Sequence, residues 1–340
     1  MKIAILTPTF NYHSGIDRVV EQQAEDYAKK GNEVAVIALE AKIKPKGYRV
    51  IELGMPKNPF LQRLYRLFLF LDSKKMGFYK NLKNYDVIIS HFYPMNWLAY
   101  KAKKRFSIKY VYWDHGINTT GLFGDAFQKF YMKLFLLLNN ITLKNIDEAY
   151  SVSSYLSKTL EKESGIKSKV VYNKIDKKRF NKKIKIEKIR EKIIKKYNLR
   201  NKKILLYVGR IAPHKGIHLL LKIFGSVKKS IPDAALLIVG KPAFNGYFKK
   251  LKNNAGNDVI FTGFVDDNDL PYYYAACDVY VTASQWEGFN LPAAEAQACG
   301  KKVVAFDIGS HKEIVKNGIL IQNKNLKEFA DALVKILKKP

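Results

Sequence analysis

The sequence predicts an α/β protein built from two doubly wound parallel sheets. Short apolar runs alternate with helical stretches along almost the whole chain of 340 residues. Several runs are nearly continuous in Ile, Val, Leu and Ala, as expected for parallel strands buried on both faces. One basic stretch near the middle interrupts this alternation. We therefore expect two Rossmann-like domains that face each other across a cleft.

The expected strands fall into two sets, one on each side of the basic stretch. The first set covers 3–7, 34–39, 86–90, 109–113 and 148–152, and the second covers 203–208, 235–239, 258–261, 278–282 and 302–306. The predicted domains are 1–172 and 202–340, joined by a basic linker at 173–201. Ligands of such sheets bind beyond the carboxyl ends of the strands, so the site is expected there.

The composition indicates a folded protein. Hydrophobic residues make up 47% of the chain and aromatic residues 13%, which is sufficient for packed cores. The two cysteines, Cys277 and Cys299, are too few for a disulfide framework and are expected to be buried hydrophobes. The chain begins directly with a strand pattern, and no run is long enough to span a bilayer. We expect a cytoplasmic protein, free or bound to the membrane surface.

The formal net charge is +30, from 60 basic and 30 acidic residues. Residues 167–203 alone carry 17 Lys or Arg against 3 Asp or Glu. This segment is best interpreted as a solvated linker and helix face, and the alternative is an anionic partner. No aromatic stacking motif or nucleic-acid module accompanies the charge, so nucleic acid is not expected as a partner.

The segment 57–83 has a distinct pattern that predicts a basic amphipathic helix. Its apolar residues alternate with basic ones, and the segment contains one acidic residue, Asp72. Such a helix lies on an anionic bilayer with its apolar face among the headgroups. The alternative is a helix that packs the same apolar face on the sheet. The sequence leaves both interpretations open.

Two glutamates eight positions apart, Glu287 and Glu295, form the most informative motif. Glu287 falls in a glycine-containing loop, and Glu295 falls one turn into an expected helix with Pro292 in its first turn. Backbone N–H groups at such a helix start bind anions such as a diphosphate. Two carboxylates around a diphosphate site suit a nucleotide sugar.

The residues around this pair resemble those of the retaining family 4 glycosyltransferases, which have the GT-B fold. That family carries Glu-Gly-Phe-Gly-Leu-Pro followed by Glu-Ala-Met-Ala-Cys-Gly, and this chain has Glu-Gly-Phe-Asn-Leu-Pro at 287–292 and Glu-Ala-Gln-Ala-Cys-Gly at 295–300. The resemblance runs from Lys2 to about Leu320. It implies transfer of a hexosyl unit from a UDP- or GDP-sugar, with no cofactor. The basic amphipathic pattern at 57–83 in turn suggests a glycan or lipid-linked acceptor of the cell envelope.

The resemblance also implies roles for the residues of this motif. Glu295 would hold the ribose hydroxyls and Glu287 the hydroxyls of the transferred sugar. A covalent role for Glu287 does not follow from the resemblance. The sugar and diphosphate would be held by the backbone N–H groups around Phe289, Asn290 and Leu291. Asn290 replaces the usual Gly, and asparagine tolerates unusual φ values better than most residues.

The expected strand 203–208 is followed by Gly209 and Arg210, and then by Lys215. This matches the Gly-Arg and Lys-Gly element of the family. Arg210 presents a fork that fits a diphosphate and Lys215 adds a point charge, so both would stabilise the leaving group. The family loop that cradles the base corresponds to Gly263, Phe264 and Val265.

Asp267, Asn268 and Asp269 look like a metal-binding Asp-x-Asp motif. They stand directly before Leu270-Pro271, where the family has a helix cap, and Asp and Asn are good caps. We therefore interpret them as a cap and expect no essential metal.

Two elements of the first half carry the same resemblance. Gly15 opens a helix after the first strand, where a glycine lets the backbone approach a phosphate and an acceptor. His115 follows the strand 109–113 and would contact the donor sugar, with Asp114 orienting its ring or contacting an acceptor hydroxyl.

Three departures from the family pattern keep alternatives open. Lys174 and Asn290 replace glycines, and the stretch 324–340 predicts one short helix where many members have a long helix that crosses back to the first domain. The alternatives are a nucleotide-sugar epimerase on the same fold and an inactive relative that binds polyanions through its charge.

Overall fold

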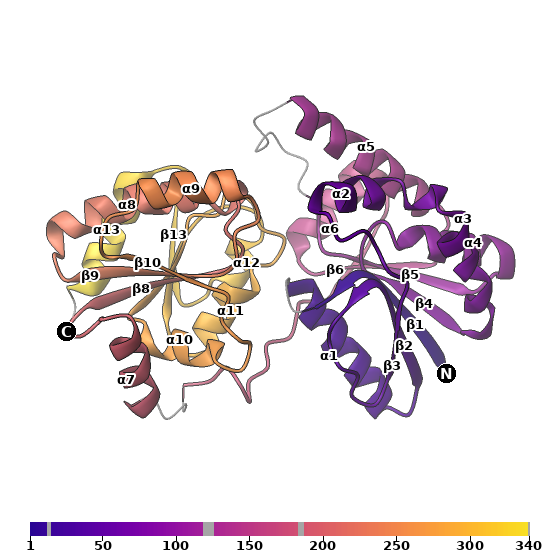
Figure 1. The fold of residues 1–340 in the computed structure, drawn as a ribbon, viewed down its shortest axis with the longest axis horizontal. Helices are drawn as coiled ribbons and strands as arrows, with labels where there is room; N and C mark the ends of the chain where they lie inside the picture. Colours follow the sequence, from indigo (N-terminus) through magenta and orange to yellow (C-terminus); the bar gives the residue numbers. More distant parts are fainter. Residues whose placement is uncertain (12–14, 118–125, 183–186, 339–340) are drawn as a thin grey trace. The chain divides into compact units, whose positions relative to one another are not determined.

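The computed structural model describes residues 1–11, 15–117, 126–182 and 187–338. The chain divides into two compact units, Met1–Asn173 and Lys174–Pro340 (Figure 1). Each unit contains one sheet, and all the strand pairs recorded within the two sheets are parallel.

The first unit has a seven-stranded sheet in the order β3-β2-β1-β4-β5-β6-β7. Its strands are β1 Lys2–Phe10, β2 Glu33–Ala41, β3 Arg49–Glu52, β4 Val87–Ser90, β5 Lys109–Asp114, β6 Glu148–Ser151 and β7 Lys169–Val170. The strand order reverses between β1 and β4. Loops that leave the carboxyl ends of these two strands therefore diverge, which opens the usual ligand position of a doubly wound sheet.

Helices cover both faces of this first sheet. They are α1 Gly15–Lys29, α2 Pro59–Leu67, α3 Ser73–Met76, α4 Asn96–Phe106, α5 Ala126–Thr142 and α6 Ser154–Ser164. One core cluster lies beneath α4 and includes Leu6, Ile88 and Leu98, and a second lies beneath α1 and includes Ile5 and Val20. Burial of these side chains fixes the sheet between the helical layers.

The segment 57–83 is not the single helix that its pattern predicts. Helix α2 ends at Leu67, a 3-10 turn covers Leu69–Leu71, and α3 begins at Ser73. Helix α2 ends where Phe68 leaves the helical conformation, and α3 starts where the Asp72 carboxylate accepts hydrogen bonds from Lys75 N at 3.0 Å and from the Tyr65 hydroxyl at 2.7 Å. A capping carboxylate satisfies the first turn of a new helix, so the chain restarts there in a new direction.

The second unit has a six-stranded sheet in the order β10-β9-β8-β11-β12-β13. Its strands are β8 Lys203–Val208, β9 Ala234–Val239, β10 Val259–Gly263, β11 Val279–Thr282, β12 Lys302–Phe306 and β13 Gly318–Ile321. Its helices are α7 Glu187–Lys196, α8 Ile217–Ser230, α9 Asn245–Asn253, α10 Leu270–Ala276, α11 Leu291–Ala298, α12 His311–Ile314 and α13 Leu326–Leu337. The order reverses between β8 and β11, which makes this the switch point of the second sheet.

The basic segment 173–201 packs in part on the second unit. Phe180, Ile193 and Leu199 are buried in the core cluster that also contains Tyr274 and Ala296. In the part of this segment whose side chains the structure describes, the lysines are exposed, and α7 packs against α10. Within the described residues, no helix combines the length and apolar character needed to cross a bilayer.

Candidate functional site

The switch point of the second sheet brings two distant loops together. One loop leaves β8 and contains Arg210 and Lys215, and the other leaves β11 and contains Glu287. The loops are tied by a hydrogen bond from Gln285 N to His214 O at 2.8 Å. Gly216 adopts φ 66°, and a Cβ there would lie 1.8 Å from the carbonyl oxygen of Ala283, so only glycine permits this approach.

Lys215 and Glu287 form a close ion pair at this point. The ammonium group of Lys215 lies 2.8 Å from each carboxylate oxygen of Glu287, whose exposed fraction is 6%. Burial raises the pKa of Glu287, but the charge of Lys215 and its hydrogen bonds to the carboxylate outweigh burial, and the pKa stays below its ordinary value. The carboxylate is therefore ionised and able to accept hydrogen bonds.

Asn290 adopts the left-handed conformation that the family's glycine would have, with φ 68°. Its side-chain oxygen accepts a hydrogen bond from Ala293 N at 3.2 Å and caps α11. Its amide nitrogen lies 2.8 Å from His311 Nε2, while His311 Nδ1 lies 2.7 Å from the Phe306 carbonyl oxygen. Since the carbonyl requires a donor, His311 carries its proton on Nδ1 and accepts from Asn290. Asparagine thus keeps the loop geometry and adds two contacts.

A third loop supports Glu287 from β12. Ser310 N donates to the Glu287 carbonyl oxygen at 3.3 Å, and a Cβ on Gly309 would lie 2.4 Å from the same oxygen. Sequence reasoning did not select Gly309 or His311. The signal was present, because a glycine and a histidine follow the predicted strand 302–306 within five residues.

Glu295 lies on α11, in the interior between α10 and α11. Its exposed fraction is low, and its Oε2 accepts a hydrogen bond from the buried Tyr274 hydroxyl at 2.7 Å. Pro292 stands in the first turn of α11, as the sequence predicts, and Leu291 is its first residue. Phe289, just before the helix, is buried. The tyrosine fixes one carboxylate oxygen in place, and sequence reasoning did not find it.

Glycines line the carboxyl ends of the neighbouring strands. Gly209 and Gly240 have φ values of 150° and 144°, and a Cβ on Gly240 would lie 1.9 Å from the Gly209 carbonyl oxygen. Gly240 N donates to Gly263 O at 2.9 Å, which ties the end of β10 to the same edge. At this end of the sheet Gly209, Gly240 and Gly263 carry no side chains. The exposed Arg210 directly follows Gly209.

Phe264 and Val265 extend from the end of β10. The Phe264 ring is 48% exposed, and the Lys241 ammonium group lies 4.6 Å from its centroid. Val265 is partly buried in the core cluster beneath α10. The three residues predicted to cradle a base thus lie at the same carboxyl-end edge as Gly209, near the edge strand β10.

The Asp267 to Asp269 stretch does not cap α10 with its side chains, contrary to the interpretation from sequence. Asp269 occupies the cap position, but it has helical φ and ψ of −86° and −19° and makes no side-chain capping bond. A capping residue normally has extended backbone, which aims its oxygen at the first turn. Asp267 instead pairs with Arg179, whose Nη2 lies 3.1 Å from Oδ2.

In the first unit, two histidines lie side by side at the carboxyl ends of neighbouring central strands. His115 directly follows β5, and His91 directly follows the neighbouring strand β4. The ring of His115 is hydrogen-bonded to His91, not oriented by Asp114 as the sequence suggested. The Asp114 carboxylate accepts from Gly116 N at 2.9 Å and from the Ser151 hydroxyl at 3.3 Å. Burial raises the pKa of Asp114 to about 6. Gly15 begins α1, and the loop residues just before it, 12–14, lie outside the described residues.

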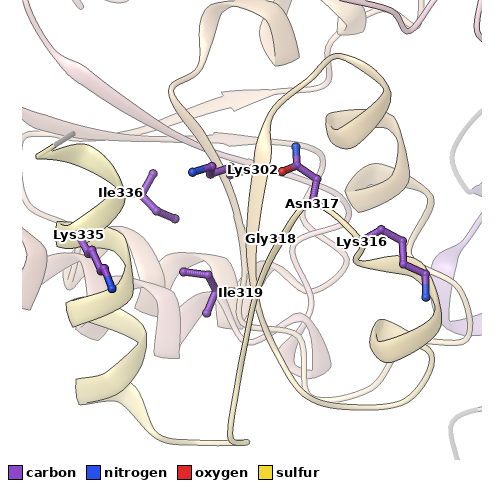
Figure 2. Close-up of a pocket in the computed structure, with 7 residues that line it drawn as sticks. All are labelled: Lys302, Lys316, Asn317, Gly318, Ile319, Lys335 and Ile336. Carbon is purple, nitrogen blue, oxygen red and sulfur yellow. The ribbon is translucent and has the colours of Figure 1, made fainter. Parts of the chain in front are cut away.

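A pocket of about 310 Å³ lies elsewhere on the second unit (Figure 2). Its walls come from the amino ends of β12 and β13 and from α13, and include Lys302, Lys316 and Lys335. The predicted site residues follow the carboxyl ends of strands. This pocket is therefore at the opposite end of the sheet from them and contributes none of the predicted site residues.

Two Rossmann-like units, one with cations, glycine turns and an ionised carboxylate at its switch point, define a protein of the nucleotide-binding α/β class. Family models identify it further. The model for Glycosyltransferase Family 4 matches residues 13–179, and the model for Glycosyl transferases group 1 matches residues 189–340. The chain belongs to the group 1 glycosyltransferases, which have the GT-B fold.

Two curated relatives illustrate the similarity. Spore coat protein SA of Bacillus subtilis is 29% identical over 225 residues, which cover 61% of this chain and 60% of that protein. The GDP-mannose-dependent alpha-(1-6)-phosphatidylinositol monomannoside mannosyltransferase of Mycobacterium tuberculosis is 29% identical over 160 residues, covering 44% and 42%. The chain thus matches less than two thirds of the length of either relative.

Solved structures extend the similarity of fold to the full chain. A sucrose-phosphate synthase from Thermosynechococcus elongatus has a TM-score of 0.85 at 23% identity and covers 100% of this chain and 90% of its own. HepE of Anabaena in complex with UDP-glucose has a TM-score of 0.79 at 21% identity, with the same coverage. At these identities the comparison establishes the fold.

Proposed function

We propose that this protein is a retaining glycosyltransferase that moves a hexosyl unit from a UDP- or GDP-sugar to a glycan or lipid-linked acceptor in cell-envelope biosynthesis. The observation that carries this proposal is the Lys215–Glu287 pair beside Gly209 and Arg210 at the switch point of the second sheet. Family membership supports sugar transfer. The resemblance of the motif at 287–300 supports the retaining outcome.

The proposed chemistry assigns the cations to the leaving group. As the bond between the sugar and the diphosphate breaks, negative charge grows on the phosphate oxygens. Arg210 is exposed at the strand end and presents a bidentate fork, and Lys215 supplies a second positive charge. The helix start at 289–291 adds backbone N–H donors. These groups would neutralise the diphosphate without a metal ion or other cofactor.

The carboxylates are assigned to hydroxyl groups. Glu287, kept ionised by Lys215, would accept from hydroxyls of the transferred sugar, and Glu295 would accept from the ribose. His115 would contact the sugar from the first unit, and Gly15 would approach the phosphate and the acceptor. In a front-face reaction the leaving phosphate oxygen takes the acceptor proton, so no enzyme carboxylate needs to act as a covalent nucleophile.

The donor is proposed as a class and not as one compound. HepE was crystallised with UDP-glucose, and the Mycobacterium tuberculosis relative is named for GDP-mannose. Both are nucleoside diphosphate hexoses. The edge formed by Gly263, Phe264 and Val265 would read the base mainly through backbone groups, so side chains there discriminate little between uracil and guanine.

Ligand-induced thermal stabilisation tests the proposed donor site. UDP, GDP, ADP and their common sugar conjugates are added in the presence of EDTA to wild type, Glu295→Ala and Arg210→Ala. A matched control is Arg200→Ala, which removes an equally exposed arginine outside the site. We expect one nucleotide to raise the Tm of wild type and of the control, with a smaller or absent shift in the two site variants. Absence of any shift in wild type contradicts the proposal.

Product analysis decides between transfer and the rival activity. With an acceptor, a retaining transferase gives a product whose anomeric configuration equals that of the donor. An epimerase instead changes the sugar of the donor when no acceptor is present. Conversion of the donor without an acceptor favours the epimerase. Binding of polyanions without any nucleotide effect favours the inactive relative.

We further propose that the acceptor lies at a membrane and that the protein binds the cytoplasmic face peripherally through α2, α5 and the turn after α2. This α2–α5 surface bears exposed apolar side chains, of which Leu71 is 71% and Phe130 66% exposed. The two helices contact each other, because the Tyr131 hydroxyl donates to Arg63 O at 3.2 Å (Figure 1). Residues 57–83 and 126–144 carry one acidic residue, Asp72, among many lysines and arginines. Exposed apolar groups within a basic surface suit an anionic bilayer.

Flotation with vesicles tests this membrane contact separately. We expect binding to vesicles that contain phosphatidylglycerol and little binding to phosphatidylcholine alone. The double variant Leu71→Ser/Phe130→Ser should float several-fold less than wild type. The control Val171→Ser changes an exposed valine outside the α2–α5 surface and should float as wild type does. If wild type does not float with anionic vesicles, the proposed membrane contact is wrong. The nucleotide-binding and product experiments still test sugar transfer independently.

A further inference from the structure

Three side chains of the first unit form a continuous hydrogen-bonded chain. Gln23 Oε1 lies 2.7 Å from His91 Nε2, and His91 Nδ1 lies 2.9 Å from His115 Nε2. The two imidazole rings are nearly coplanar, with an interplanar angle of 23° and centroids 5.2 Å apart. This is the geometry of rings joined edge to edge, where the N–H of one ring points at the in-plane lone pair of the other.

The three residues come from three different elements. Gln23 lies on α1, His91 follows β4, and His115 follows β5. His91 is fully buried, its backbone N–H donates to Leu6 O at 2.9 Å, and its ring stacks on Trp113. The central ring of the chain is therefore fixed by the sheet itself. Its two ring nitrogens are committed to Gln23 on one side and to His115 on the other.

The proton positions follow from the end of the chain. The Gln23 carbonyl oxygen only accepts, so His91 must carry its proton on Nε2. A neutral His91 then has a lone pair on Nδ1, and His115 must donate to it from Nε2. A neutral His115 that donates from Nε2 has a bare Nδ1, which is a hydrogen-bond acceptor.

We propose that Gln23 and His91 are positioning residues that hold His115 in its Nε2–H tautomer, so that His115 Nδ1 accepts a hydrogen bond from a hydroxyl of the transferred sugar. The role in sugar recognition rests on the proposed function. The tautomer itself rests only on the hydrogen-bond chain. In this arrangement His115 selects a hydroxyl donor and does not supply a proton.

Burial supports the neutral state of both rings. It lowers the pKa of His115 to about 3, and burial together with His115 lowers the pKa of His91. A proton on either ring would be desolvated and would break the order of donors and acceptors. The chain thus keeps His115 uncharged at neutral pH, as an acceptor of a hydroxyl proton requires.

Nitrogen NMR of the full-length protein with ¹⁵N-labelled histidine reads the tautomer directly. The measurement compares wild type with Gln23→Met, which removes the acceptor at similar size, and with Gln22→Met, which makes the same change one position earlier on α1. We expect His115 to be a single Nε2–H tautomer in wild type and in Gln22→Met. In Gln23→Met the signal should move towards a mixture of the two tautomers.

Kinetics add the functional half of the test. Loss of one oriented hydrogen bond to the donor sugar should lower kcat/KM for the donor by about tenfold in Gln23→Met and leave Gln22→Met unchanged. A donor that lacks the recognised hydroxyl should show no difference between the variants. Equal loss with both donors would mean that Gln23 serves the fold alone and would overturn the sugar contact.

Failure of this proposal and failure of the proposed function give different results. A wild-type His115 in the Nδ1–H tautomer, or a tautomer that is the same in Gln23→Met, overturns the hydrogen-bond chain even in an active enzyme. If no nucleotide sugar binds to wild type, the proposed function fails, and the NMR spectrum still decides whether Gln23 and His91 fix the tautomer.

Discussion

The ammonium group of Lys215 lies 2.8 Å from both carboxylate oxygens of Glu287, although the two residues are 72 positions apart. The sheet order brings them together, because β8 and β11 are neighbours at the switch point. Each charge keeps the other in place at the edge where a diphosphate sugar is expected to bind.

Removal of the cation should leave a buried charge without its partner. We expect Lys215→Met to lower the free energy of unfolding by about 3 kcal/mol at pH 7, because breaking a buried ion pair costs more than the pair contributes. The pKa of Glu287 should rise, so the deficit should shrink at pH 5. Urea unfolding measures both effects. Lys222→Met, at an exposed position of α8, is the control and should stay within about 0.5 kcal/mol of wild type. A Lys215→Met variant as stable as this control would show that the pair contributes nothing in solution.

The loop before α11 should prefer Gly to Ala at position 290. Asn290 has φ 68°, and a residue with a Cβ that lacks local hydrogen bonds pays about 1 kcal/mol or more there. Asn290→Ala also loses the cap on Ala293 N and the contact to His311, whereas Asn290→Gly avoids the strain. We expect a loss of about 2 kcal/mol for Ala and less than half of that for Gly. Equal losses in chemical denaturation would show that the conformation at 290 is not the cause.

Two glycines in the second unit should respond in opposite ways to alanine. A Cβ on Gly240 would lie 1.9 Å from the Gly209 carbonyl oxygen, at φ 144°, so Gly240→Ala should unfold several degrees lower than wild type. Gly246 lies in α9 and a Cβ there meets nothing within 4 Å. Gly246→Ala should therefore gain about 0.5 kcal/mol from helix propensity. Thermal unfolding of the two variants compares them, and a neutral Gly240→Ala would contradict the close approach of the strand ends.

Stability should depend on pH through one partly buried histidine, His214, and one buried acid, Asp114. Burial and the nearby charge of Lys215 lower the pKa of His214 to about 4, below the unfolded value of 6.5. The contribution of neutral His214 to the free energy of unfolding is therefore present above pH 6.5 and is lost as the pH falls towards 4. Asp114 acts in the opposite direction, because its pKa is raised to about 6 and its neutral form is favoured as the pH falls from 6 to 4.

Unfolding experiments between pH 7 and pH 4.5 separate these two contributions. His214→Gln should lose less stability than wild type over this range, and Asp114→Asn should lose more. The control is Asn317→Gln, a neutral change at an exposed position away from both groups. Parallel pH profiles for all four proteins would show that neither group changes its protonation with unfolding in this range.

Much of the architecture could be predicted from sequence because the central strands are continuous apolar runs. The strand expected at 203–208 has those bounds in the structure, and the one at 302–306 does as well. The strands that were missed, β3, β7 and β13, are all at sheet edges and are four residues long or shorter. Each of these strands is too short to carry the longer apolar run that marks a strand such as β8.

Most of the predicted site residues of the second unit lie in short contiguous sequence motifs. Glu287, Asn290 and Glu295 lie in one such motif, and Arg210 and Lys215 lie in another. Gln23, His91 and Tyr274 were missed, because sheet order and helix packing bring them to their partners and no spacing in the chain records it. The helix expected at 57–83 failed for a related reason. The period of its apolar residues suits a helix, but the first helix ends at Leu67 and the Asp72 carboxylate caps a separate helix that begins at Ser73.

The division of the chain into consecutive units has a consequence for synthesis. Every strand of the first sheet precedes Asn173, and every strand of the second follows Lys174. The ribosome therefore completes all the partners of β1 before any strand of the second sheet emerges. The strands of the nascent first unit are therefore able to pair with one another before any strand of the second sheet has been synthesised. This order of synthesis reduces wrong pairing between the strands of the two sheets, whose orders are similar.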